Sequence, residues 1–225
     1  MARYALISDL HGNLENLQAI MESASGRADK IFVTGDYLDA KVSKKNIGQR
    51  AEWPLEDVVD DNPALWEVLI SACRLIRGNQ EERIATALGG QDVPPLLAQL
   101  LGTAAEWATP TTRFVHGHRF TWFREGDELM HPVLAEPTDR PVVVHGHSHR
   151  RLLTFGLGDP GEPPRLRFEP ETGRTYQLPQ GERSLINLGA ARDAAAHWAL
   201  YDEEAGTVSF ETAAAAIAVR TKESQ

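Results

Sequence analysis

Short apolar runs, each followed at once by polar residues and glycine, recur along the first half of the chain. Residues 4–8 and 30–34 are such runs, and their length and composition are typical of buried strands. Between them, apolar residues recur at helical spacing from Leu14 to Met21, and Asn13 stands where a helix N-cap is expected. A strand, a helix and a second strand in this order predict an α/β unit with a parallel pair of strands.

The rest of the chain divides into a helical part and a part rich in strands. We expect helices from Asn62 to about Cys73, over 81–88 and over 94–107, with a short strand at 75–76. Glycine, proline and aspartate then separate seven expected strands, at 112–116, 119–123, 141–145, 151–155, 184–188, 197–202 and 206–211. The pattern predicts a single domain over residues 1–225.

Two segments depart from this regular pattern. Residues 41–62 are polar and irregular, and we interpret them as a surface insertion, either an ordinary loop or a lid over a site. Residues 156–183 are rich in glycine and proline and contain two weak strand candidates, which predicts an extended hairpin insertion.

Composition narrows the class of protein. Hydrophobic residues make up 42% and charged residues 24% of the 225 residues, values typical of a globular domain. The formal net charge is −9, so the sequence has no excess of basic residues that would indicate nucleic-acid binding. No apolar run reaches the length of a membrane span or a signal-peptide core, and Cys73 has no second cysteine to pair with, so we expect a cytoplasmic protein.

Side chains that bind metals follow the expected strands in five clusters. The carboxyl ends of parallel strands meet at one edge of a sheet, so side chains on the turns that follow them can share one pocket. Glycines next to several of these residues allow the backbone to bend and approach closely. The clusters are Asp9-x-His11, Gly35-Asp36, Gly78-Asn79, His116-Gly117-His118 and Gly146-His147-Ser148-His149.

The chemistry of these clusters indicates the kind of metal. Each motif alone is usually a turn or a polar strand end, but five in this order are hard to explain as turns. Their ligands are oxygen and imidazole nitrogen with no thiolate, which suits Mn, Fe, Zn, Ni or Co and disfavours a structural zinc site. Three further histidines, His131, His145 and His197, receive no role; His145 is expected in the core or at the surface, and His197 in packing. The tryptophans Trp53, Trp66 and Trp122 could line a pocket, but core positions are expected.

Taken together, the five clusters resemble the motifs of the calcineurin-like metallophosphoesterases, especially the small bacterial and archaeal phosphodiesterases. That family has Asp-x-His, Gly-Asp-x-x-Asp, Gly-Asn, a His before Gly, and Gly-His-x-His in this order. Residues 186–189 (INLG) also resemble the Asn-Pro-Gly element of its small members. The resemblance implies an α/β fold, a four-layer α/β/β/α sandwich of two mixed sheets flanked by helices.

The resemblance also implies roles for single residues. Two divalent metal ions, manganese foremost, would share a bridging hydroxide that attacks phosphorus in line. One ion would be held by Asp9, His11, Asp36 and His149, and the other by Asp36, Asn79, His116 and His147. Asp39 and Gln80 would hold the metal ligands in position without binding the metal themselves. Asn79 and His118 would assist catalysis by hydrogen bonds. Asn13 and His118 would contact the substrate.

One position departs from the family pattern. Gln80 stands where the monoesterases of the family often carry a histidine that is thought to protonate the leaving oxygen. A glutamine cannot act as a general acid, although its amide can donate a hydrogen bond. The substitution therefore favours phosphodiesters, or other esters with good leaving groups.

Two alternatives remain open at this stage. The protein could be a phosphomonoesterase of the same fold, acting on proteins or nucleotides. It could also be a binding scaffold without activity, as some relatives are, although a scaffold has no need of a complete ligand set. In either enzymatic case the expected partner is a small-molecule phosphate ester.

Overall fold

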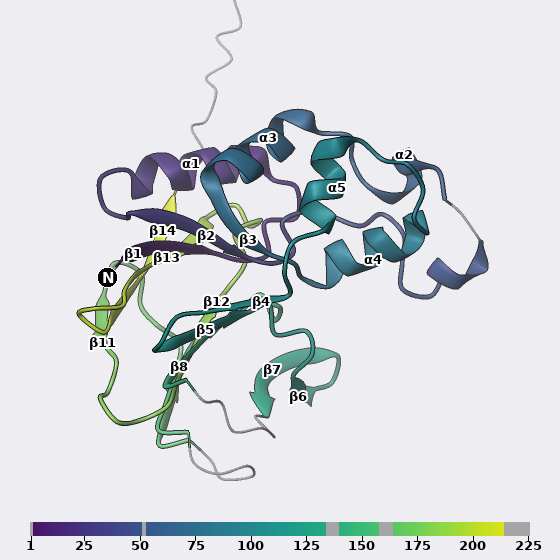
Figure 1. The fold of residues 1–225 in the computed structure, drawn as a ribbon. Coiled ribbons are helices and arrows are strands. Elements are labelled where there is room, and N and C mark those ends of the chain that lie inside the picture. Colours follow the sequence, from purple (N-terminus) through teal and green to yellow (C-terminus); the bar gives the residue numbers. More distant parts are fainter. Residues whose placement is uncertain (1, 51–52, 134–139, 158–163, 214–225) are drawn as a thin grey trace, which may run out of the picture.

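The computed structural model describes residues 2–50, 53–133, 140–157 and 164–213. Two six-stranded mixed sheets face each other, and the helices lie on the side of one of them (Figure 1). This confirms the predicted fold class. The helices are α1 (Leu14–Ala24), α2 (Leu55–Val58), α3 (Pro63–Ala72), α4 (Asn79–Leu88) and α5 (Pro95–Leu101), with a 3₁₀ turn, η1, at Ile47–Gln49.

The first sheet has the strand order β11-β14-β13-β1-β2-β3, and β1, β2 and β3 are mutually parallel. Helices α1 and α3 cover its outer face (Figure 1). Its strands are β1 (Arg3–Ile7), β2 (Lys30–Thr34), β3 (Cys73–Ile76), β11 (Thr175–Gln177), β13 (Ala196–Asp202) and β14 (Thr207–Ala213).

The second sheet has the order β10-β9-β12-β8-β5-β4, and β5, β8 and β12 are mutually parallel. A separate hairpin of β6 (Thr121–Glu125) and β7 (Glu128–Val133) lies beside it (Figure 1). The sheet strands are β4 (Glu106–Ala108), β5 (Thr112–Val115), β8 (Val142–His145), β9 (Arg151–Phe155), β10 (Leu166–Phe168) and β12 (Ser184–Leu188).

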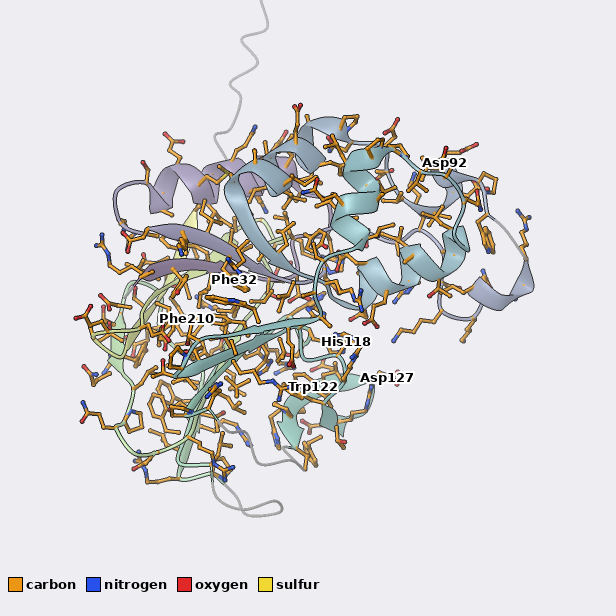
Figure 2. The ribbon with its side chains drawn as sticks, viewed as in Figure 1. Phe32, Asp92, His118, Trp122, Asp127 and Phe210 are labelled. Atoms are coloured by element: carbon orange, nitrogen blue, oxygen red, sulfur yellow. The ribbon has the colours of Figure 1, made fainter. Side chains whose placement is uncertain are left out.

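Strand alternation divides the core into two main clusters. On β1, Ala5 and Ile7 face the cluster beneath the helices, whereas Tyr4 and Leu6 face the cluster between the sheets. Phe32 and Phe210 fill the space between the sheets from opposite ends of the chain (Figure 2). The buried apolar residues on both faces of β1 explain why its sequence is a continuous apolar run.

Most of the expected elements are confirmed, including the Asn13 cap, whose side chain accepts a hydrogen bond from the Asn16 N–H. The helix expected over 94–107 is wrong in its second half, since α5 ends at Leu101 and β4 follows. Trp107 on β4 stacks on Phe114 with ring centroids 5.1 Å apart. Pairing of β4 with β5 packs that half-buried ring against the core, and this tertiary contact outweighs the local helical pattern.

The hairpin expected within 156–183 is also wrong. Its two strand candidates do form strands, but β10 pairs with β9 in the second sheet and β11 pairs with β14 in the first. The segment therefore crosses between the sheets instead of folding on itself; residues 158–163 lie outside the described part.

Residues 41–62 are more deeply buried than we expected for a surface insertion. Val42, Val58 and Val59 are buried in the cluster beneath the helices, and the Lys41 N–H donates to the Val58 carbonyl. Both ends of the segment are thus fixed to the core. A lid function stays a prediction, and residues 51–52 lie outside the described part. No helix among the described residues is long and apolar enough to cross a membrane.

Truncation of Leu6 tests the packing between the sheets. Leu6 is fully buried, so we expect Leu6→Ala to lower the free energy of unfolding by about 2–5 kcal/mol in urea titrations. Leu166→Ala is the matched control, because Leu166 is 43% exposed and its truncation should change stability by no more than about 0.5 kcal/mol. Equal effects of the two substitutions would contradict the assigned core.

Candidate metal centre

The five motif clusters meet at one rim of the molecule. Six parallel strands, three in each sheet, end there, and the polar clusters lie on the turns that follow β1, β2, β3, β5 and β8. The sixth strand, β12, leads into a turn whose Ala191 and Arg192 N–H groups donate to the Ser8 and Asp9 carbonyls. The two facing sheets thus bring residues far apart in the sequence to one place.

Two groups of side chains at this rim could each hold a metal ion. The first is Asp9, His11 and His149, and the second is Asp36, His116 and His147; within each group the candidate ligand atoms lie within 4.8 Å of one another. The backbone N–H of His147 donates to Asp9 Oδ2 at 3.0 Å, which joins the groups.

Closer distances within the groups define their shape. In the first group, His149 Nε2 lies 3.3 Å from Asp9 Oδ1 and 3.4 Å from His11 Nε2. In the second, His116 Nε2 lies 3.3 Å from Asp36 Oδ2 and 3.1 Å from Asn79 Oδ1. The structure thus brings all seven predicted ligands to this rim. The sharing of Asp36 between two ions stays a prediction.

The backbone at five of these residues adopts a left-handed conformation. The φ angles are 54° at Asp9, 48° at His11, 52° at Asp36, 75° at His147 and 59° at His149, and among the described residues no other non-glycine residue has a positive φ. Side chains disfavour this region, and such strain persists only where the surroundings enforce it. Its restriction to predicted ligands indicates that the fold is strained in order to aim these side chains.

Two glycines allow the close packing of the rim. A Cβ at Gly78 would lie 2.2 Å from Asp36 Oδ1, and a Cβ at Gly146 would lie 1.8 Å from Ser8 Oγ and 2.4 Å from Asp9 Oδ2. Any side chain at these positions would displace the carboxylates. The glycines of the motifs are therefore required by close approach as well as by turn geometry.

Glu81 holds the Asp36 turn in place, a role the sequence analysis did not assign. Its buried carboxylate accepts hydrogen bonds from the N–H groups of Gly78 at 2.7 Å, Leu38 at 2.9 Å and Asp36 at 3.0 Å. A glutamate is seldom fully buried without such partners. Its position two residues after Asn79 places Glu81 close to a predicted ligand in the sequence. Its hydrogen bonds to Asp36 and Leu38, however, depend on how the turn after β2 packs against α4.

Hydrogen bonds also orient the imidazole rings. Asp39 Oδ1 lies 3.0 Å from His11 Nδ1, and the Thr34 carbonyl lies 2.9 Å from His116 Nδ1. In each ring the other nitrogen, Nε2, faces the candidate site. This pairing of one ring nitrogen with an oxygen acceptor is typical of metal-binding histidines.

Burial and charge set the protonation of the rim. Burial alone would raise the pKa of Asp9, but the close contact with His149 and the charge of His116 hold it well below its usual range. Burial alone would lower the pKa of His116, but the Asp36 carboxylate raises it to about 9. Burial, with the charge of His116, lowers the pKa of His147 to about 3. A proton on His116 thus offsets buried carboxylate charge, and a bound cation would replace it.

The donor set fits divalent metal ions. Asp9 Oδ1 is buried and makes no well-aligned hydrogen bond among the described residues, and the nearby His149 Nε2 lies 3.3 Å away, although a buried carboxylate oxygen normally has a hydrogen-bond partner. The atoms around it are carboxylate and amide oxygens and imidazole nitrogens, the ligands that Mn, Fe, Zn, Ni and Co accept. The site therefore has the composition and the unsatisfied charge that a cation would balance.

Several other predicted site residues have structural partners. Gln80 Oε1 accepts from the Ala40 N–H at 3.2 Å, and Asn13 Nδ2 donates to the Arg192 carbonyl at 3.4 Å in addition to capping α1. His118 Nε2 lies 3.1 Å from Glu82 Oε2, and its ring lies 5.5 Å from that of His116. The catalytic and substrate-binding roles of these residues stay predictions.

Neighbouring aromatic and histidine residues complete the rim. His145 is buried, as expected, and burial lowers its pKa to about 4. Trp122, which we expected in the core, is half-buried on the hairpin, near His118 (Figure 2), with its ring 5.7 Å from that of His147. Only the position of the hairpin beside the rim reveals this contact, because the Trp122 sequence context is that of an ordinary strand.

Substitution of Gly78 tests the close packing around Asp36. We expect Gly78→Ala to abolish Mn²⁺ binding in calorimetry, because the new methyl group would collide with the Asp36 carboxylate. Gly48→Ala is the control, since a Cβ at Gly48 meets no atom within 4 Å. Wild-type Mn²⁺ affinity in Gly78→Ala would show that Asp36 is not held in this position.

Comparison with known structures shows a shared fold. The chain is similar to a metallophosphoesterase from Sphaerobacter thermophilus, with 18% identity and a TM-score of 0.62 over 93% of this chain and 87% of that chain. It is also similar to the phosphoesterase Yfce from E. coli (17% identity, TM-score 0.42, 89% and 88% covered) and to an archaeal phosphodiesterase (13%, 0.44, 93% and 99%). At 18% identity, the similarity to the Sphaerobacter thermophilus protein shows the fold alone.

The family follows from sequence. No curated protein matches the chain. The sequence model of the calcineurin-like phosphoesterases, however, matches residues 2–176, which include every residue of the two metal-ligand groups. The chain therefore belongs to the calcineurin-like phosphoesterase family.

Proposed function

We propose that this protein hydrolyses phosphodiesters with two divalent cations bound at the rim, manganese foremost. The supporting observation is the meeting of the two ligand groups, one around Asp9 and the other around Asp36. In the proposal, Asp9, His11 and His149 hold one cation, Asn79, His116 and His147 hold the other, and Asp36 contributes to both.

When bound, a pair of such cations lowers the pKa of a water molecule and neutralises phosphoryl oxygens. The chain's own contribution is to hold the ligands in one geometry before substrate arrives. The buried Glu81, the Asp39 contact to His11 and the left-handed turns all serve this end. Buried charges and a strained backbone are unfavourable for folding, and a scaffold without activity would not need them. Their presence at the rim argues against a role as an inactive scaffold.

Gln80 supports the preference for diesters. Its side-chain carbonyl is engaged by the Ala40 N–H, and an amide has no proton to give to a leaving oxygen. A diester with a good leaving group needs that proton least. Asn79 and His118 are then the residues we assign to hydrogen bonding with the phosphoryl group.

His118 gives specific support to the alternative, a phosphomonoesterase. Its ring lies 6.3 Å from that of His147, and Glu82 fixes its orientation through a 3.1 Å contact. A histidine in this position could protonate a leaving oxygen in place of the residue at position 80. The choice between the two ester classes therefore depends on how well His118 performs that step.

A comparison of aryl esters separates the two candidates. Protein stripped with a chelator should hydrolyse neither ester, and added Mn²⁺ should restore activity. We expect kcat/KM for bis-p-nitrophenyl phosphate to exceed that for p-nitrophenyl phosphate by about tenfold or more, because a site adapted to diesters accommodates the second ester group. Both esters release the same p-nitrophenolate, which leaves without general-acid help, so the comparison reports on the ester class itself. A preference for the monoester would favour the phosphomonoesterase.

Substitution of Asp36 tests the shared carboxylate. Asp36→Asn should reduce Mn²⁺-dependent hydrolysis by at least about 100-fold, because loss of one charge weakens both proposed cation sites. Circular dichroism should show an unchanged fold. Asp29→Asn, which alters a carboxylate paired with Arg3 far from the rim, is the control and should retain wild-type activity. Full activity of Asp36→Asn would remove the proposed role of Asp36.

A further inference from the structure

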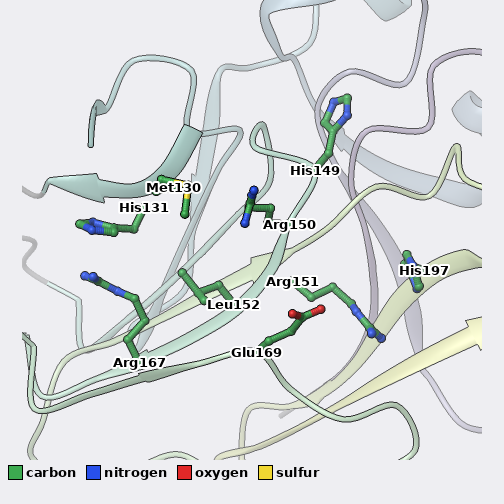
Figure 3. Close-up of a pocket in the computed structure, with 9 residues that line it drawn as sticks. All are labelled: Met130, His131, His149, Arg150, Arg151, Leu152, Arg167, Glu169 and His197. Atoms are coloured by element: carbon green, nitrogen blue, oxygen red, sulfur yellow. The ribbon is translucent and has the colours of Figure 1, made fainter. Parts of the chain in front are cut away.

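A cationic pocket adjoins the candidate metal centre. Its cavity of about 320 Å³ lies between the β6–β7 hairpin and strands β9, β10 and β13 (Figure 3). His149, a predicted metal ligand, is part of its wall, so the pocket and the metal centre share a residue. A molecule bound at the metal centre could therefore extend into this space.

The charged residues that line this pocket are three arginines and one glutamate. The arginines are Arg150, Arg151 and Arg167, and the carboxylate is that of Glu169. Figure 3 shows the Glu169 carboxylate towards Arg151 and the Arg167 guanidinium on the opposite side of the view. In a chain with a net charge of −9, such a concentration of positive charge is a local feature of this pocket.

The partners of these arginines leave positive charge unbalanced. Arg150 forms an ion pair with Glu128, whereas Arg151 donates to the neutral Thr172 hydroxyl at 2.7 Å. Arg167 has no carboxylate partner among the described residues, and its Nε is buried without a hydrogen bond. Burial also lowers the pKa of Arg167. An acceptor supplied by a ligand would satisfy this buried Nε donor.

A second unpaired polar atom lies in the same wall. His197 Nδ1 is buried without a hydrogen-bond partner among the described residues. Arg150 lies between His149 and Arg167 in the close-up (Figure 3), so donors extend from the metal centre to the far end of the pocket. Met130 and Leu152 supply apolar wall between them, which suits the organic part of a substrate.

We infer that this pocket binds a second phosphate group of the substrate, so that the preferred substrates are phosphate esters carrying another phosphate besides the one that is cleaved. Guanidinium groups bind phosphate through paired, charge-assisted hydrogen bonds, and a second phosphate would supply the acceptors that Arg167 lacks. The inference rests on the proposed function, because it places the cleaved phosphate at the metal centre.

A matched pair of substrates tests the inference. The p-nitrophenyl ester of thymidine 5′-phosphate and its 3′-phosphorylated derivative have the same leaving group and differ by one phosphate. With Mn²⁺, we expect the 3′-phosphate to raise kcat/KM by roughly tenfold or more, the value of a charge-assisted hydrogen bond. In Arg167→Gln this advantage should fall to about one. No advantage in the wild-type protein would overturn the inference.

Matched variants control for general effects. Arg165→Gln alters an exposed arginine two residues away that is already paired with Glu182, and it should keep the wild-type advantage. Arg151→Gln changes a pocket arginine that donates to the neutral Thr172 hydroxyl; it should also reduce the advantage, and it provides a second test if Arg167→Gln does not fold. A reduced advantage in Arg165→Gln equal to that in Arg167→Gln would overturn the inference.

A binding measurement separates this inference from the proposed function. Calorimetry with thymidine 3′,5′-bisphosphate should show affinity for the wild-type protein that is weakened roughly tenfold in Arg167→Gln. If neither ester is hydrolysed but this dependence on Arg167 holds, the phosphate subsite stands and the proposed hydrolysis fails. If the esters are hydrolysed but binding of the bisphosphate is indifferent to Arg167, the subsite fails and the proposed hydrolysis stands.

Discussion

The burial of two carboxylates at one rim is the constraint on which the rest of the structure depends. Asp9 and Asp36 are almost completely removed from water, which would cost several kcal/mol for each charge if nothing compensated it. Histidines supply part of the compensation, and the proton on His116 supplies more. Asp9 Oδ1 lies 3.3 Å from His149 Nε2 but makes no well-aligned hydrogen bond among the described residues, and a bound cation would complete its surroundings.

The same constraint explains the strained backbone. Left-handed turns are unfavourable for side chains other than glycine, yet here they occur at predicted ligands on the turns after β1, β2 and β8. Parallel strands packed into two buried sheets fix where each turn begins, and Glu81 ties the turn after β2 to the start of α4. The core therefore supports the strain, and the rigid turns keep the ligand atoms together before any ion binds.

The two halves of the chain contribute differently to the site. The N-terminal half supplies the buried carboxylates, and the C-terminal half supplies histidines and the arginines of the adjoining pocket. The crossing of residues 164–178 between the sheets sets Arg167 on β10 at the pocket wall. A change in this segment could alter the groups that meet the substrate while leaving the carboxylate turns intact, since the strands that carry those turns lie elsewhere.

The sequence by itself determined the α/β unit and the set of candidate ligands, and its resemblance to a known family implied the sandwich of two sheets. Apolar runs ending in Asp, Asn or His are local patterns, and parallel strands necessarily bring their carboxyl ends to one edge. Tertiary structure alone decided the end of α5 at Leu101, the separation of β10 from β11, the role of Glu81 and the position of Trp122 beside His147. Each of these depends on a partner distant in the sequence, whose packing or hydrogen bond outweighs a local preference that is worth less.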